Sequence, residues 1–103
     1  MTDTKSKILD IAMNLNRIGN WAADGYLPRK DKIKVFLENT SLYIKNVDKT
    51  EFNPVFSKTF KDFQEKYLIL EKEGIKGPKD DLYWAEEMMT WGNILTHRAK
   101  LLD

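Results

Sequence analysis

Apolar residues recur three and four positions apart in four stretches of this 103-residue chain, and glycine or proline separates one stretch from the next. This spacing places the apolar side chains on one face of an α-helix, because a helix completes a turn in 3.6 residues. No stretch shows the alternation of apolar and polar residues that is typical of a half-buried strand. The pattern predicts an all-α protein, with a single domain over residues 1–103.

The first predicted helix spans residues 4–24. Gly25 follows it, and glycine commonly ends a helix because it adopts the left-handed backbone conformation at little steric cost. Pro28 can then open a second helix, since the first helical position needs no amide hydrogen. We expect this second helix to end near Asn46.

The third predicted helix begins after Asn53, a favourable N-cap residue, and ends at Gly74. Ile75, just beyond, is expected to fold back onto the helix as the apolar contact of a Schellman cap. A fourth helix starts at Asp80 or Asp81 and runs almost to the C-terminus. Four helices joined by short loops favour an antiparallel up-down-up-down four-helix bundle.

Gly92 lies in the middle of the fourth predicted helix, where a glycine costs about 1 kcal/mol relative to alanine. Small residues are spaced seven positions apart around it, and two more have the same spacing in the first helix. In antiparallel neighbours, the numbers of facing residues have a constant sum, and the pairs Ala12–Gly92 and Gly19–Ala85 both add to 104. We therefore predict that the first and fourth helices pack closely through small residues: Ala12, Gly19, Ala85, Gly92 and Ala99. Room for a ligand beside Gly92 is the alternative.

Some apolar residues fall outside the predicted core face. On the fourth helix they are Tyr83, Ile94 and Leu101, and on the first helix Leu9 and Met13 form a weaker second patch. Contiguous apolar surface often marks an interface. We predict that the chain binds another protein, or a second copy of itself as a homodimer, through these residues.

Aromatic residues suggest an alternative function. Trp21, Tyr26 and Trp84 could line a small pocket at one end of the bundle, close to the turn at Gly25. The chain would then be a receptor for a small ligand.

The chain has one histidine, His97, and Lys100 follows it three residues later. A histidine in the last turn of a helix usually provides a favourable charge at the negative end of the helix dipole. The spacing of His97 and Lys100 also resembles that of histidine phosphotransfer domains, which are four-helix bundles with an exposed phosphorylatable histidine. That resemblance implies a phosphoacceptor role for His97. This chain has Leu101 where that family commonly has glycine, and its histidine lies nearer the end of the helix.

Other chemistry is excluded by the residues that are absent. The chain has no cysteine and only one histidine, so it lacks the ligands of a zinc site or of a ferritin-like di-metal site. No glycine-rich phosphate loop or nucleophile motif occurs. We therefore expect a non-enzymatic protein without catalytic residues, metal or cofactor.

Charge and hydropathy limit the partners further. The formal net charge is +1, and the basic cluster at residues 29–34 is too small to predict a nucleic-acid site. The N-terminal sequence lacks the unbroken apolar run of a signal peptide or a membrane span. We expect a cytoplasmic protein that binds neither nucleic acid nor membrane.

Overall fold

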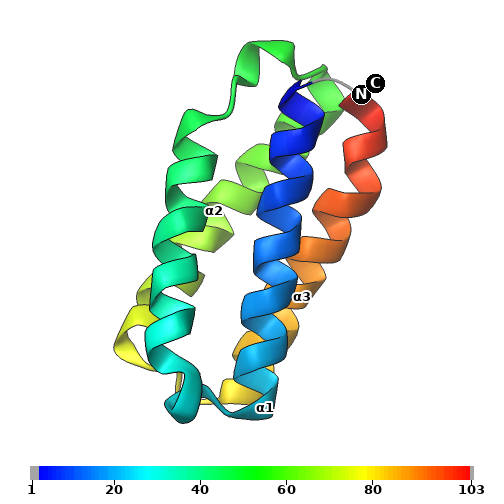
Figure 1. Cartoon of the computed structure of the whole chain (residues 1–103). Helices are drawn as coiled ribbons and strands as arrows, with labels where there is room; N and C mark the ends of the chain where they lie inside the picture. Colours follow the sequence, from blue (N-terminus) through cyan, green and yellow to red (C-terminus); the bar gives the residue numbers. More distant parts are fainter. Residues whose placement is uncertain (1–2, 103) are drawn as a thin grey trace.

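The computed structural model describes residues 3–102, and these form helices and no β-strand (Figure 1). The all-α prediction is confirmed. The three α-helices in this range are α1 (Asp3–Asn46), α2 (Pro54–Lys76) and α3 (Asp81–Arg98). Two short 3₁₀ helices follow α1 and α3, namely η1 (Lys49–Glu51) and η2 (Ala99–Leu102).

The predicted count of four separate helices is wrong, because the first two form the single element α1. Within α1, only Gly25 leaves helical dihedral angles, at φ 136° and ψ 112°, and Pro28 lies inside the element. The chain reverses at Gly25 without a separate loop, so α1 is a hairpin whose first arm (residues 3–24) and second arm (residues 26–46) lie side by side (Figure 1). The two arms, α2 and α3 then alternate in direction along the chain (Figure 1).

The predicted apolar faces meet in one core that runs the length of a molecule of 38 × 20 × 19 Å. Phe56, Phe60 and Phe63 of α2 are almost completely buried, as are Trp84 and Met88 of α3. The first arm of α1 contributes a buried apolar face whose residues are spaced three and four positions apart: Ile8, Ile11, Leu15, Ile18 and Ala22.

Side-chain caps start α2 and α3 at the predicted residues. The Asn53 side chain accepts a hydrogen bond from the Phe56 amide at 2.9 Å, and Pro54 takes the first helical position. Asp80 accepts a hydrogen bond from the Tyr83 amide at 3.0 Å. Each cap satisfies an amide that the first turn of a helix leaves without an internal partner.

The predicted end of α2 at Gly74 is wrong. The helix continues to Lys76, and its C-cap residue, Gly77, has a positive φ of 102°. Gly74 is buried inside the helix, where a Cβ would lie 2.5 Å from Cζ2 of Trp84. Its lack of a side chain therefore makes room for the indole instead of ending the helix. Ile75 lies inside α2 and is 49% exposed, so it is not the residue beyond the helix end that the expected cap required.

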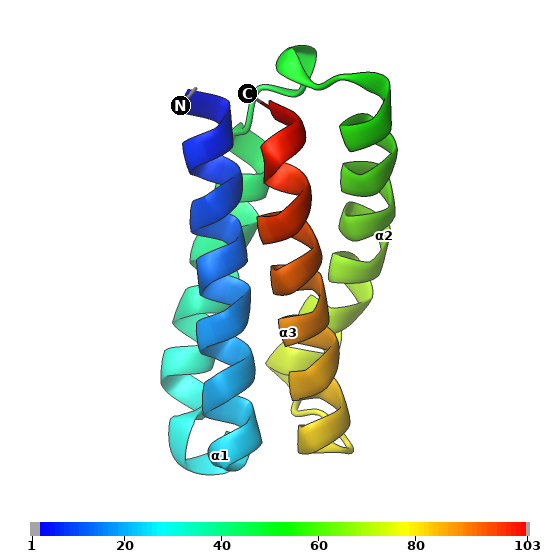
Figure 2. The ribbon, with the colours of Figure 1, turned by 90° about the vertical axis from the view of Figure 1, so that its right-hand side faces the viewer.

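The predicted close packing of the first and last helices is confirmed for α1 and α3. The first arm of α1 and α3 lie side by side along their length (Figure 2). A Cβ on Gly92 would lie 3.0 Å from the Ala12 carbonyl oxygen, and one on Gly19 would lie 2.9 Å from that of Ala85. These are the two pairs whose numbers add to 104, and Ala99 is fully buried farther along α3. Small residues that face one another thus allow the two helix backbones to approach closely.

Candidate functional site

Of the apolar residues that were predicted to form an interface, Tyr83 and Ile94 lie on α3 and Leu101 lies in η2, and Tyr83 and Leu101 border clefts shared with α2. Tyr83 is 62% exposed and shares a cleft of about 600 Å³ with residues of α2 and the α2–α3 turn. Leu101, in η2, is 40% exposed and borders a second cleft near the opposite end of the molecule. Ile94 is partly buried. Ile94 lies on the same face as Arg98 and Leu101, because it precedes them by four and seven residues.

Leu9 and Met13 are separate from this surface. Leu9 is partly buried against the core from the first arm of α1, and Met13 is exposed. Neither residue lines the clefts beside Tyr83 or Leu101. Tyr83 and Leu101 thus border clefts that they share with α2. The second predicted patch, Leu9 and Met13, lies apart from these clefts.

Two adjoining clefts lie where the start of α2 meets the end of α3, and both are lined by Val55 and Arg98. The larger has a volume of about 460 Å³ and the smaller about 310 Å³. We call them together the basic cleft, which is lined by Pro54, Val55, Lys58, Thr59, Asp62, His97, Arg98, Lys100 and Leu101.

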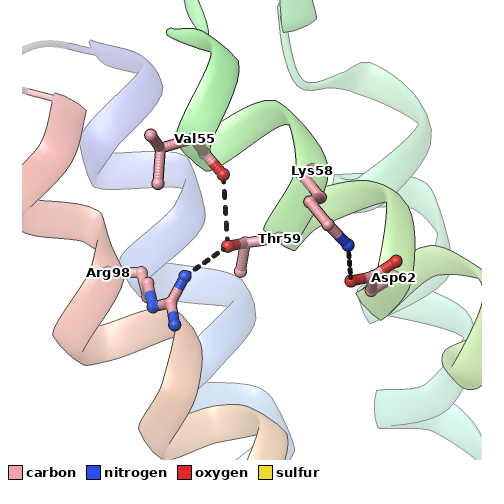
Figure 3. Close-up of polar contacts among 5 residues, drawn as sticks. All are labelled: Val55, Lys58, Thr59, Asp62 and Arg98. Atoms are coloured by element: carbon pink, nitrogen blue, oxygen red, sulfur yellow. Dashed lines mark hydrogen bonds and ion pairs between the residues drawn. The ribbon is translucent and has the colours of Figure 1, made fainter.

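The Arg98 side chain is held by a hydroxyl group of α2 (Figure 3). Its Nη1 donates a hydrogen bond to Thr59 Oγ1 at 2.9 Å, and the Thr59 hydroxyl donates to the Val55 carbonyl at 3.3 Å. Thr59 is only 7% exposed. A buried anchor therefore orients a guanidinium group that is itself exposed.

The basic cleft has an excess of positive charge. Lys58 forms an ion pair with Asp62 at 3.2 Å (Figure 3). Within residues 3–102, no other carboxylate lines the basic cleft, and none pairs with Arg98 or Lys100. Exposed apolar side chains, Val55 at 58% and Leu101 at 40%, lie beside these cations.

Polar contacts also join α2 to the N-terminal half of α3, before Ile94. Lys66 of α2 forms an ion pair with Glu87 of α3 at 3.2 Å, and the Tyr83 hydroxyl donates a hydrogen bond to the same carboxylate at 3.3 Å. Glu87 therefore contacts both Tyr83 and Lys66. The cleft next to Tyr83 has balanced charge, since Glu73 and Asp80 are offset by Lys76 and Lys79.

The three residues of the predicted aromatic pocket do not come together. Tyr26 and Trp84 pack edge to face, with ring centroids 6.4 Å apart, and both are buried. Trp21 instead packs on Phe36, with centroids 4.8 Å apart, and the Lys32 ammonium lies over its ring.

Hydrogen bonds fix Tyr26 and Trp84 as parts of the core. The Trp84 indole donates to the Leu70 carbonyl at 2.9 Å, and the Tyr26 hydroxyl donates to the Gly74 carbonyl. Burial, followed by the nearby Asp81 and Asp31 carboxylates, raises the pKa of Tyr26. These two rings are therefore held within the core, although Trp84 also lines the cleft beside Tyr83.

His97 is exposed in the last turn of α3 and lines the smaller part of the basic cleft with Lys100. This position fits a favourable charge at the C-terminal end of the helix. The phosphoacceptor role implied by the resemblance stays a prediction.

Sequence reasoning missed Val55 and the role of Thr59. A single valine in the first turn of a helix carries no periodic signal. Thr59 lies on the edge of the buried face of α2, and its hydrogen bond reaches a residue 39 positions away. Only the tertiary structure brings Thr59 and Arg98 together.

Other kinds of site find no support in the described part of the chain. Within residues 3–102, no group of three or more histidine, aspartate or glutamate side chains is placed to hold a metal ion. Over the same range, no helix has the length and apolar character needed to cross a membrane. Comparison with models of protein families, with curated proteins and with solved structures finds no match.

Proposed function

We propose that this protein is a non-enzymatic binding module that recognises another protein at the surface where α2 meets α3 and η2. The observation that supports the proposal best is the basic cleft, in which exposed Val55 and Leu101 lie beside the Arg98 guanidinium. Protein interfaces commonly combine apolar anchors with a polar rim, and arginine and tyrosine are enriched among the residues that dominate binding energy.

Tyr83 extends the proposed surface toward the opposite end of α3. Its ring is exposed and its hydroxyl donates a hydrogen bond to Glu87, so the ring presents apolar area to a partner. Rigid aromatic groups lose little entropy on binding. We propose Val55 and Leu101 as one anchor and Tyr83 as a second.

The partner is expected to bind an already folded chain. The accessible surface is 6216 Å², close to the roughly 6,000 Å² typical of a folded monomer of this mass. The core therefore closes without a second protein, and a homodimer through the same surface is the alternative occupant.

Site-specific photocrosslinking tests the location of this surface. A photoreactive phenylalanine analogue is placed at Leu101 or Tyr83 in the cell of origin, and at Leu42 as a control. Leu42 is exposed on the second arm of α1, away from α2–α3 clefts. We expect a discrete adduct from Leu101 and Tyr83 that Leu42 does not give.

The mass of the adduct identifies the occupant. An adduct of twice the chain's mass would establish a homodimer, and a different mass would establish another protein. Equal labelling from Leu42, or no adduct from either test position, would contradict the proposed surface.

A further inference from the structure

We infer that the basic cleft binds an acidic segment of a protein partner, in which a carboxylate pairs with Arg98 and a neighbouring apolar side chain covers Val55 and Leu101. The inference rests on the proposed function and specifies the chemistry of the partner. It is argued from the charge, the hydrogen bonding and the exposed apolar groups of one cleft.

The guanidinium of Arg98 is suited to a carboxylate. An arginine carries five N–H donors in a planar fork that matches the two oxygens of a carboxylate. One donor is directed at Thr59, which leaves the others for a ligand. Because Thr59 is buried, it fixes the direction of the fork before binding, so Thr59 is a positioning residue for the proposed contact.

The chain does not supply this carboxylate from its described residues. Asp62, the one acid among the described residues that lines the basic cleft, is paired with Lys58 at 3.2 Å. Lys58, Arg98 and Lys100 therefore leave the cleft with two more positive than negative charges. Charge complementarity then favours a partner that supplies the acid.

The exposed apolar residues favour a protein segment over a nucleic acid. Val55 and Leu101 would face phosphates and water in a complex with a nucleic acid, whereas an apolar side chain of a peptide would remove them from water. The whole chain has a net charge of only +1, which provides little of the long-range attraction on which nucleic-acid binding depends.

Selection from a random peptide library displayed on phage tests the inference with the full chain. We expect the selected peptides to be enriched in aspartate or glutamate next to an apolar residue. In a labelled-peptide assay, Arg98→Gln should weaken their binding about ten- to a hundredfold, because it removes a charge-assisted hydrogen-bond pair. Addition of salt should weaken it further.

Charge reversal gives a sharper test. Selection on the double variant Arg98→Glu/Lys100→Glu should enrich lysine or arginine instead of acids. Lys72→Glu is the matched control, since Lys72 is exposed on α2 outside the basic cleft and its change also reverses a charge. It should keep the preference for acidic peptides. Circular dichroism and thermal unfolding establish that each variant is folded, and Lys100→Glu alone provides a second variant at an exposed position.

Thr59→Val tests the positioning role. Valine has nearly the same shape but offers no acceptor to Arg98, so peptide affinity should fall while the preference for acids persists. Thr59→Ser, which keeps the hydroxyl, should restore the affinity. Equal loss in both variants would contradict the role.

The outcomes separate this inference from the proposed function. If the selected peptides fail to bind the Leu101→Glu variant but are not enriched in acidic residues, the inference would be overturned, while the proposed binding surface would stand. Failure to select any peptide that depends on Leu101 or Val55 would count against both. Labelled single-stranded DNA that binds as tightly as the peptides, with the same dependence on Arg98, would show a general anion site and overturn the assignment to a protein.

Discussion

Gly92 of α3 lies directly against the backbone of Ala12 in the first arm of α1, where a Cβ on the glycine would come within 3.0 Å of the alanine carbonyl oxygen. The same Cβ would lie 2.6 Å from the Asn16 side-chain oxygen. The asparagine can move, but the carbonyl belongs to a helix. The contact therefore limits any larger residue at position 92.

Gly92→Leu is expected to destabilise the protein by about 1–3 kcal/mol or more, because overfilling a tight contact forces two helices apart. Urea denaturation followed by circular dichroism measures the change. Asn93→Leu is the control, since Asn93 is exposed on the same helix and its replacement should stay within about 0.5 kcal/mol of the wild type. Equal stability of the two variants would contradict the packing role of Gly92.

Gly25→Ala is expected to cost about 1–3 kcal/mol through backbone strain, because alanine rarely adopts a strongly positive φ. The φ angle here is 136°, and the atoms nearest an added Cβ are 3.7 Å away, so crowding is not the cause. Thermal and urea unfolding measure the loss. Asn20→Ala, at an exposed helical position in the same arm, should have little effect. A Gly25→Ala variant as stable as the wild type would show that the reversal does not require glycine.

Asn53 joins the start of α2 to η2. Its side-chain oxygen caps α2, and its Nδ2 donates a hydrogen bond to the Leu101 carbonyl at 2.6 Å. Asn53→Ala should cost about 1–2 kcal/mol, since the cap is lost together with the second bond. Asn53→Asp keeps the cap acceptor but places an oxygen against the Leu101 carbonyl.

The two Asn53 variants are distinguished by hydrogen exchange. Asn53→Asp should be more stable than Asn53→Ala while the amides of η2 lose protection. Unchanged protection of η2 in Asn53→Asp would show that the bond to Leu101 does not order this segment.

Tyr67 makes stability sensitive to alkaline pH. Burial raises the pKa of its phenol, whose hydroxyl donates to the Leu37 carbonyl at 2.9 Å. The folded state therefore holds the proton more tightly than the unfolded state does. The contribution of this bound proton to the free energy of unfolding is complete below the unfolded pKa of about 10. It is lost as the pH rises toward the higher folded pKa.

The free energy of unfolding should fall above about pH 10, by up to about 1.4 kcal/mol per pH unit for this one proton. Tyr67→Phe should cost about 1 kcal/mol at neutral pH and make the alkaline decline shallower. Urea denaturation on both sides of pH 10 measures both effects. Tyr43→Phe, at an exposed position, leaves Tyr67 intact and should keep the wild-type decline. If the free energy of unfolding of Tyr67→Phe fell with pH as steeply as that of the wild type, Tyr67 would not be the cause of the alkaline decline.

The helix starts and the buried faces could be predicted because their signals are local. Asn53 and Asp80 cap helices through bonds to amides three residues away, and the apolar residues spaced three and four apart on the first arm are buried. The close packing of α1 and α3 followed from small residues seven positions apart, since regular spacing on two antiparallel helices defines a register.

Gly74 shows the limit of such reasoning. It was predicted as a helix end, but it makes room for the Trp84 indole, whose N–H donates to Leu70 of α2. The reversal at Gly25 was located correctly, but the sequence did not reveal that one residue would complete the turn. Both features depend on how neighbouring helices approach one another.

Local sequence is thus sufficient for the all-α class, the caps and the core faces, because capping and periodicity act within a turn or two of a helix. The basic cleft is a product of the fold, since Val55 and Thr59 meet Arg98 and Leu101 only when α2 and α3 have a particular rotation and axial offset. Those two quantities are set by the packing of large side chains such as Phe63 against Trp91, with ring centroids 5.8 Å apart. Residues distant in the sequence jointly determine them.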